Sequence, residues 1–126
     1  GSIDLVVGEI QNTPAELGAF DVSLALNAID MLNEPEGLPK LQGALLRPGG
    51  VAIQSCPYIW HAVVADELRK MLPENVRDSA GAVEWLYEST GLKIFEKIDH
   101  LPWLFFKQAR QLEIYSVHLF MARKIA

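Results

Sequence analysis

Polar side chains lie close to the points where three apolar runs of the sequence end. The runs span residues 3–8, 20–29 and 51–55, and each has the composition of a buried strand. Ligands of open α/β sheets bind at the carboxyl ends of the strands, so residues near these points are the first candidates for chemistry. They are Glu9, Asn27, Asp30, Tyr58, Trp60 and His61.

Most of these candidates also have an ordinary structural explanation. His61 could accept a proton or contact a substrate. Asp30 could equally be a helix N-cap, and Glu9 a solvated loop carboxylate. Tyr58 and Trp60 could line a pocket, where an aromatic face attracts a cationic group by roughly 0.5–2 kcal/mol. Aromatic side chains are nevertheless more often core residues, so both explanations stay open.

An aromatic and basic stretch, residues 99–111, separates two further predicted strands. It includes Trp103, which we expect in a loop beside the binding site. It also includes Arg110, which could bind a substrate carboxylate through two parallel hydrogen bonds. A solvated basic loop is the alternative for Arg110. We therefore predict a substrate site formed by Tyr58, Trp60, Trp103 and Arg110.

The histidines and the cysteine do not form a metal-binding pattern. His61, His100 and His118 lack the short spacing of zinc ligands, and Cys56 is the only cysteine. No His, Asn or Asp partner marks Cys56 as a nucleophile, so we predict that it packs in the core. We expect no metal ion in the site.

Composition limits both the class of protein and its partners. The chain has 126 residues, 50% of them hydrophobic, and can bury a core of its own as a single domain. Its formal net charge of −5 argues against nucleic acid and anionic membranes as partners and favours a small or neutral ligand. The single cysteine and the lack of a long apolar run predict a soluble, cytoplasmic protein.

The order of the predicted elements is that of an α/β domain. Strands are expected at 3–8, 20–29, 51–55, 92–98 and 113–124, and helices within 38–45, 57–73 and 79–90. A turn at residues 47–50 ends the first helix, Ser79 is the expected N-cap of the last, and Gly91 its left-handed C-terminal residue. A strand, a helix and a strand in succession predict parallel pairing, whereas the last two strands predict an antiparallel pair.

Two motifs at this spacing carry a resemblance to a known family. They are Phe20-Asp21-Val22 and Leu46-Arg47-Pro48-Gly49-Gly50. With the surrounding elements they resemble the C-terminal half of class I methyltransferases, which use S-adenosylmethionine. The resemblance implies a partial Rossmann-like sheet made of strands 3 to 7 of the family order 3-2-1-4-5-7-6, with the last strand antiparallel and helices beside it.

A narrower resemblance concerns the substrate. Ile29-Asp30, residues 56–61 and residues 115–124 are similar to carnosine N-methyltransferases and to the methyltransferase domains of ovothiol biosynthesis, which act on imidazole nitrogens. It implies that Asp30 accepts the N–H of an imidazole and leaves the opposite nitrogen nucleophilic. The acceptor is then a small molecule or peptide.

The same resemblance places the cofactor. Glu9 and Ile10 lie where the family contacts the adenine, and Asn27 is assigned to cofactor binding at the end of the second run. Asp30 and His61 are the expected catalytic residues.

One part of the family pattern is missing. The sequence contains no G-x-G-x-x-G loop and no acidic residue after a strand 2. We therefore expect that the cofactor-binding half lies upstream and that this chain alone binds S-adenosylmethionine poorly.

The alternatives to a methyltransferase half follow from the same gap. One is a catalytically silent methyltransferase-like assembly module, and a weaker one is another α/β enzyme such as a reductase. Residues 3–8 would lack their neighbouring strands, so they should pair beside residues 20–29, be disordered, or pair with another chain in a homo-oligomer.

Overall fold

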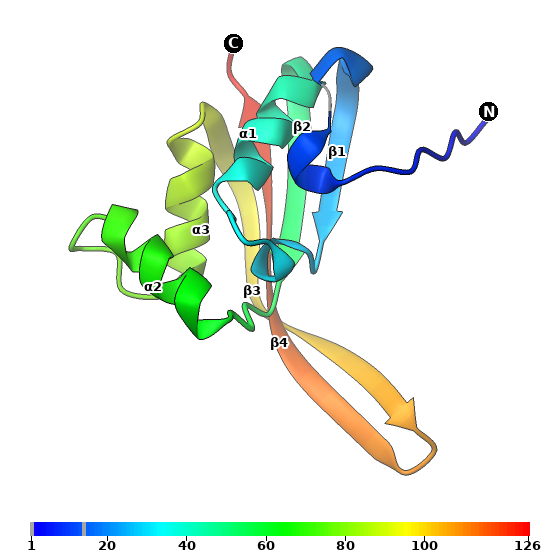
Figure 1. Cartoon of the computed structure of the whole chain (residues 1–126), viewed down its shortest axis with the longest axis vertical. Helices are drawn as coiled ribbons and strands as arrows, with labels where there is room; N and C mark the ends of the chain where they lie inside the picture. Colours follow the sequence, from blue (N-terminus) through cyan, green and yellow to red (C-terminus); the bar gives the residue numbers. More distant parts are fainter. Residues whose placement is uncertain (1, 14) are drawn as a thin grey trace.

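The computed structural model describes residues 2–13 and 15–126 and contains a mixed four-stranded sheet (Figure 1). The strands are β1 (Phe20–Leu26), β2 (Leu46–Cys56), β3 (Leu92–Gln108) and β4 (Gln111–Lys124). Their order in the sheet is β1-β2-β4-β3, with β1 parallel to β2 and β4 antiparallel to both of its neighbours. The α/β class, the parallel pair and the antiparallel last strand are confirmed, and the order is 4-5-7-6 in the family numbering.

In the part of the chain that the structure describes, three α-helices accompany the sheet, together with three short 3-10 turns. The helices are α1 (Gly37–Leu45), α2 (Ala62–Met71) and α3 (Ser79–Glu88), and the turns are Ile10–Asn12, Ala15–Leu17 and Ile29–Met31. Among the described residues no helix combines the length and the apolar character needed to cross a membrane.

The core lies between the sheet and the helices α1 and α3. Tyr87 of α3 meets Phe120 of β4 edge to face, with ring centroids 4.8 Å apart. The Tyr87 hydroxyl donates to the side chain of Gln42 in α1, whose amide nitrogen donates to the Ser23 carbonyl of β1 at 3.2 Å. Because this chain of contacts joins both helices to the same side of the sheet, α1 and α3 cover one face.

The opposite face of β1 is bare. Four apolar side chains point outward along this strand and are between 49% and 64% exposed. They are Phe20, Val22, Leu24 and Leu26. Parallel strands are normally covered on both faces, and β1 also has a free edge because its only neighbour is β2 among the described strands.

The predicted strand at residues 3–8 is wrong. This segment has no strand structure and extends away from β1, with the Ile3 and Val7 side chains almost fully exposed (Figure 1). Pairing beside β1 in parallel needs a crossover of a dozen or more residues, and only residues 9–19 are available for it. The proposed pairing of this segment with another chain stays a prediction.

The predicted loop at residues 99–111 is also wrong. The strand that begins at Leu92 continues to Gln108, so that β3 and β4 form a long hairpin that projects beyond the sheet (Figure 1). Cross-strand pairs such as Trp103 and Tyr115, with ring centroids 5.2 Å apart, stabilise it. We call residues 99–117 the arm. A shift in pairing register between Ile98 and Leu101 marks the base of the arm, and His100, within this shift, has a positive φ of 55°.

Two expected boundaries are shifted. The motif at residues 47–50 belongs to β2 as a bulge rather than preceding the strand, since Phe20 pairs with Leu46 while Val22 pairs with Val51. The N-cap of α3 is Asp78, one residue before the predicted Ser79: its Oδ1 accepts the Gly81 N–H at 2.7 Å.

Gly91 has a φ of 82° after α3, as the sequence predicted.

Candidate functional site

The carboxyl ends of β1 and β2 carry a buried carboxylate. Asp30 is only 5% exposed, and its Oδ2 accepts the backbone N–H of Ile59 at 2.7 Å. It therefore ties the segment after β1 to the segment after β2. The helix N-cap explanation for Asp30 is wrong, because the cap position of the Ile29–Met31 turn is Ala28.

Asn27 lies directly after β1 and turns the chain. Its φ is 54°, a left-handed conformation that Asn tolerates, and its backbone N–H donates to the Ser55 carbonyl at 2.6 Å. Its side-chain Oδ1 is buried and has no hydrogen-bond partner among the described residues. Buried acceptors are nearly always satisfied, so this oxygen is a candidate acceptor for a ligand N–H.

Tyr58 lies two residues after β2 in a strained conformation. Its φ is 60°, which is rare for a bulky side chain. Its hydroxyl lies 2.6 Å from His118 Nδ1 and accepts from Gln54 Nε2 at 3.2 Å, and its ring is parallel to that of Trp60 with centroids 5.8 Å apart. Burial raises the pKa of Tyr58 above its ordinary value, so the phenol stays neutral.

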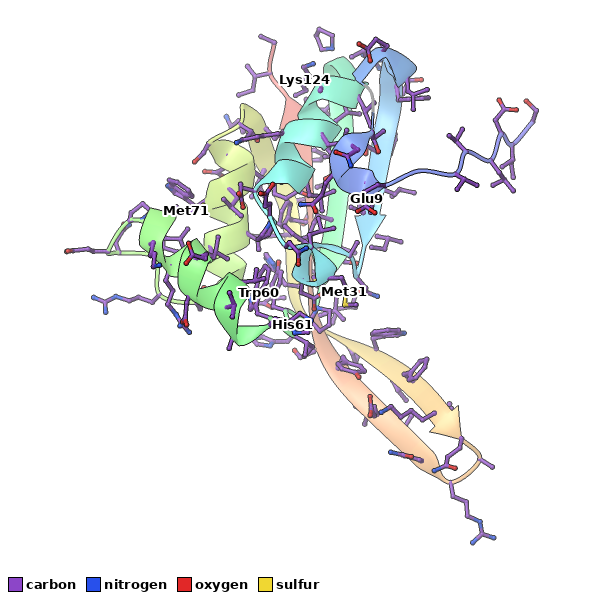
Figure 2. The ribbon with its side chains drawn as sticks, viewed as in Figure 1. Glu9, Met31, Trp60, His61, Met71 and Lys124 are labelled. Atoms are coloured by element: carbon purple, nitrogen blue, oxygen red, sulfur yellow. The ribbon has the colours of Figure 1, made fainter. Side chains whose placement is uncertain are left out.

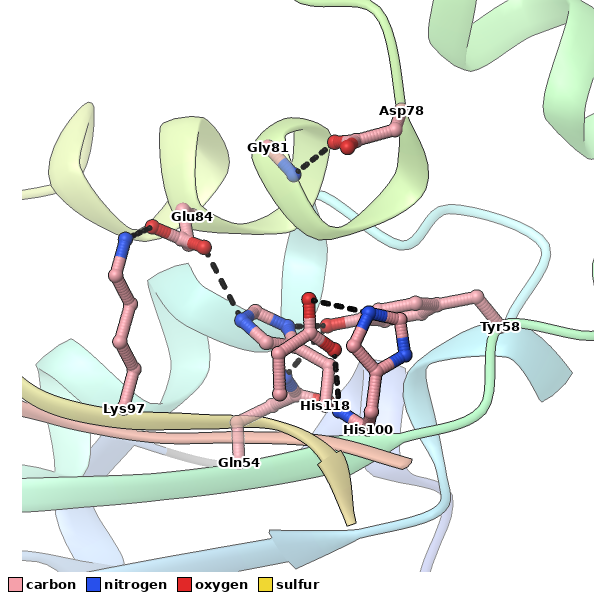
Figure 3. A network of polar contacts seen from close by, with 9 residues as sticks. Gln54, Tyr58, Asp78, Gly81, Glu84, Lys97, His100 and His118 are labelled. Carbon is pink, nitrogen blue, oxygen red and sulfur yellow. Dashed lines mark hydrogen bonds and ion pairs between the residues drawn. The ribbon is translucent and has the colours of Figure 1, made fainter. Parts of the chain in front are cut away.

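Behind Tyr58 a chain of polar side chains crosses the molecule (Figure 3). His118 of β4 is 3% exposed, and its Nε2 lies 3.1 Å from Glu84 Oε2 of α3. The other oxygen of Glu84 binds Lys97 Nζ of β3 at 2.8 Å, and this hydrogen bond raises the pKa of Lys97. The Glu84 carboxylate favours the Nε2–H tautomer of His118, which leaves Nδ1 to accept the Tyr58 O–H.

The role of His118 is not evident from the sequence. Its alternation with Phe120 indicated only a strand residue facing the core, and no local pattern connects it to Glu84 or Tyr58, which are distant in the sequence. The pairing register that brings these residues together is a property of the folded sheet.

Cys56 is a core residue, as predicted. It is fully buried at the end of β2, and burial raises the pKa of its thiol to about 12. The thiol therefore stays protonated near neutral pH and is a poor nucleophile. Nearby, the Gln54 side-chain oxygen is a second buried acceptor without a partner among the described residues.

Trp60 and His61 lie at the start of α2, beside this cluster (Figure 2). The Trp60 indole N–H donates to Ser79 Oγ at 3.0 Å, and its ring lines a cavity of about 150 Å³ between α2 and α3. His61 occupies the cap position of α2, is exposed, and makes no capping hydrogen bond from its side chain.

Glu9 and Ile10 lie on another part of the molecule, beside α1 and β1 (Figure 2). Glu9 is exposed, and its carbonyl accepts the Asn12 N–H at 3.0 Å. Ile10 lines a mainly apolar cavity of about 290 Å³ with residues of β1 and α1. Leu26 and Ala28, which flank Asn27, line the same cavity as Ile10.

Trp103 and Arg110 lie on the arm, away from the strand ends. Arg110 is in the turn between β3 and β4. The seven strand steps from Gln111 to His118 span about 23 Å at 3.3 Å per residue. One small ligand cannot contact both Asp30 and Arg110 in this arrangement.

Within residues 2–13 and 15–126, no three His, Cys, Asp or Glu side chains come together in a way that could hold a metal ion.

Comparisons with known proteins connect this geometry to a fold. No protein-family model matches the chain, and no curated protein matches it. Solved structures do: an S-adenosylmethionine-dependent methyltransferase from Thermotoga maritima, a candidate histamine N-methyltransferase, has a TM-score of 0.61 at 16% identity over 97% of this chain. The chain has the class I methyltransferase fold.

Two further neighbours show how broad this fold is. A candidate methyltransferase from Bacillus halodurans C-125 has a TM-score of 0.67 at 12% identity. The match covers 98% of this chain and 78% of the Bacillus halodurans protein. The [4+2]-cyclase SpnF has a TM-score of 0.61 at 13% identity over 98% of this chain. Since a cyclase shares the methyltransferase fold, the fold by itself does not determine the reaction.

The neighbours are longer than this chain. It spans 64% of the Thermotoga maritima protein and 57% of SpnF, while almost all of its own residues are matched. The remaining residues of these two proteins have no counterpart in this chain.

Proposed function

We propose that this chain is the substrate-side half of an S-adenosylmethionine-dependent methyltransferase. The observation that carries the proposal is the sheet order β1-β2-β4-β3 with Asn27 and Asp30 at the carboxyl end of β1. This is the edge at which open α/β sheets bind ligands. The methyltransferase neighbours support the assignment of methyl transfer to that edge.

The fit of the cofactor to the described residues is partial. Asn27 Oδ1 is a buried acceptor without a partner and suits a ligand N–H, and Ile10 borders an apolar cavity beside β1. A glycine-rich turn that would let the backbone approach the cofactor is absent from the sequence. S-adenosylmethionine, when bound, supplies the methyl group from its sulfonium, and this chain would hold only one side of it.

The elements that complete the cofactor site would lie against β1. A parallel strand at its free edge and a helical layer over Phe20, Val22, Leu24 and Leu26 would bury surface that is exposed in this chain. Burial of one such side chain contributes about 1.5–3 kcal/mol, so covering these four side chains would strongly favour the association of such elements with β1. The longer neighbours support this interpretation.

The residues at the strand ends would orient the methyl acceptor and keep water out. We propose an imidazole nitrogen as acceptor, with Asp30 accepting the N–H on the opposite side of the ring. Its Oδ2 is bound to Ile59, so Oδ1 is the atom for this role. The candidate histamine N-methyltransferase among the neighbours also concerns an imidazole compound. His61, exposed beside the site, is the proposed proton acceptor.

Calorimetric titration tests the proposal. S-adenosylmethionine is titrated into this chain and into a polypeptide extended upstream in the gene. We expect weak or no binding by the chain alone and tight binding by the extended polypeptide. Tight binding by the short chain would contradict the proposal that a half is missing.

A catalytically silent assembly module is the second candidate. The observation in its favour is the missing glycine-rich turn. This alternative predicts that neither polypeptide binds the cofactor and that the exposed face of β1 is covered by another protein.

A further inference from the structure

The arm has an open backbone edge that begins where β2 ends. The Asn27 N–H donates to the Ser55 carbonyl, so the peptide groups of Ser55 face β1. Those of Gln54 and Cys56 therefore face β4, where they pair with Phe120 and His118. By the same alternation, the even-numbered residues of β4 direct their N–H and C=O groups toward the line of β2.

From His118 toward Gln111, β2 no longer runs beside β4. Pro57 and the left-handed Tyr58 turn the chain from β2 toward α2. Leu112 and Ile114 consequently direct their N–H and C=O groups away from β3, and among the described residues no strand pairs with that side of them. Their side chains are 42% and 67% exposed. Such an edge is a template for an additional strand.

We infer that this edge binds the methyl acceptor as an extended polypeptide, by adding a strand to β4. The inference rests on the proposed function and specifies its substrate class. A peptide paired antiparallel to β4 would continue the line of β2. Its amino-terminal side would lie at the end of β2, beside Tyr58, and its carboxyl-terminal side would reach Arg110 in the turn of the arm.

The length of the arm selects this class of substrate over a small molecule. The strand ends and Arg110 are about 23 Å apart, a span that an extended peptide covers with about seven residues. The edge supplies backbone hydrogen bonds without regard to sequence. The apolar side chains Leu112 and Ile114 then favour apolar residues at alternate positions of the peptide, and Arg110 favours an acidic carboxyl end.

The test uses the full chain and a fluorescein-labelled peptide. The peptide alternates valine with threonine, carries a histidine near its amino end and ends in glutamates. Fluorescence anisotropy is measured without S-adenosylmethionine, so the result does not depend on cofactor binding. We expect saturable binding, and slower hydrogen exchange of the Leu112 and Ile114 amides when the peptide is present.

A matched pair of variants isolates the backbone. Ile114→Pro removes an N–H that faces outward and should leave the pairing of the arm intact, whereas Ile114→Ala removes the side chain and keeps the N–H. We expect Ile114→Pro to bind the peptide about fivefold more weakly than Ile114→Ala, the loss of one hydrogen bond. A peptide N-methylated at alternate residues should also lose binding to the unsubstituted chain, which tests the edge without any change to the protein.

Three results would overturn the inference. The first is that the peptide does not bind, and the second is that the N-methylated peptide binds as tightly as the unmethylated one. The third is that, without peptide, light scattering detects a dimer in which the Leu112 and Ile114 amides are protected from exchange. The last result would assign the edge to a second copy of the chain. Failure of the calorimetric titration together with successful peptide binding would instead reject the cofactor assignment alone.

Discussion

His118 Nδ1 lies 2.6 Å from the Tyr58 hydroxyl, and this contact joins the middle of β4 to the segment that follows β2. Each partner has a second polar contact: Glu84 binds Nε2 of His118, and Gln54 donates a hydrogen bond to the Tyr58 oxygen. The strained φ of Tyr58 is maintained because its side chain is fixed at both the hydroxyl and the ring. The Ile59 N–H is thereby held against the Asp30 carboxylate.

We expect His118→Ala to destabilise the chain by about 1–3 kcal/mol. The substitution leaves the Tyr58 hydroxyl and Glu84 without their buried partner, and unsatisfied buried groups cost this much. Urea unfolding followed by circular dichroism measures the change. The matched control is His100→Ala, whose imidazole is exposed on the arm, with Nδ1 3.0 Å from Ser116 Oγ and Nε2 3.8 Å from Asp99 Oδ2. Equal stability of the two variants would show that the His118 contacts are not significant.

Tyr87→Phe should also lower the free energy of unfolding, by about 1–2 kcal/mol. Removal of the hydroxyl leaves the buried side-chain oxygen of Gln42 without a donor, while the ring keeps its contact with Phe120. Tyr115→Phe is the control, because its hydroxyl donates to Glu113 near the surface of the arm and should change stability little. An unchanged midpoint for Tyr87→Phe would contradict the assigned hydrogen bond.

Local sequence signals were sufficient to predict the strands of the four-stranded sheet but not to predict where the sheet ends. Apolar composition identified β1 and β2, and alternation identified β4, because each pattern follows from burial on one or two faces. Residues 3–8 have the same apolar composition as β1, yet they form no strand: a strand needs a neighbour, and composition does not say whether one is within reach.

The arm and the polar chain behind Tyr58 illustrate a different limit. Asp99, His100 and Pro102 resemble loop residues, and only the pairing of Trp103 with Tyr115 reveals that the strand continues past them. Asp30 was predicted from its position after β1, since binding sites at strand ends are a general rule. His118 was not, because its partners come from elements that are distant in the sequence.

Cys56 should resist alkylation in the folded chain. Its buried thiol has a pKa near 12 and stays protonated at pH 8, whereas thiolate is the reactive form. Mass spectrometry after iodoacetamide treatment should detect the modified cysteine in urea but not in buffer. Rapid modification of the native chain would show that the thiol is exposed.

The same pKa predicts how stability changes with pH. The folded state raises the pKa of Cys56 from the ordinary value of 9.0, so it favours the protonated form. This contribution to stability is fully present below pH 9 and is lost as the pH rises from 9 toward 12. Urea midpoints measured across this range should fall less in Cys56→Ala than in the unsubstituted chain, when each is compared with its own midpoint at pH 8. An identical decrease in the two proteins would contradict the assignment.

Gly50→Ala should disrupt the bulge that precedes the regular part of β2. A Cβ at this position would lie 2.9 Å from the Arg47 carbonyl oxygen and 3.1 Å from that of Asp21, and both belong to the backbone. We expect a loss of about 1–3 kcal/mol, since the strand must shift to relieve the contact. Gly37→Ala is the control because nothing lies within 4 Å of its Cβ. Thermal unfolding of both variants measures the difference, which would be absent if the bulge adapts freely.

Asp30→Asn separates the structural role of the carboxylate from its proposed role in methyl transfer. Asparagine keeps an oxygen that can accept the Ile59 N–H, so the segment after β2 should stay in place and the midpoint of unfolding should change little. Asp30→Ala leaves that N–H without an acceptor and should destabilise the chain by about 1–3 kcal/mol. In the polypeptide extended upstream, both variants should lower kcat for methylation of an imidazole substrate while the affinity for S-adenosylmethionine stays nearly constant, because Asp30 orients the acceptor and not the cofactor. Normal kcat in Asp30→Asn would remove the carboxylate charge from the mechanism and leave Asp30 as a residue that only positions Ile59.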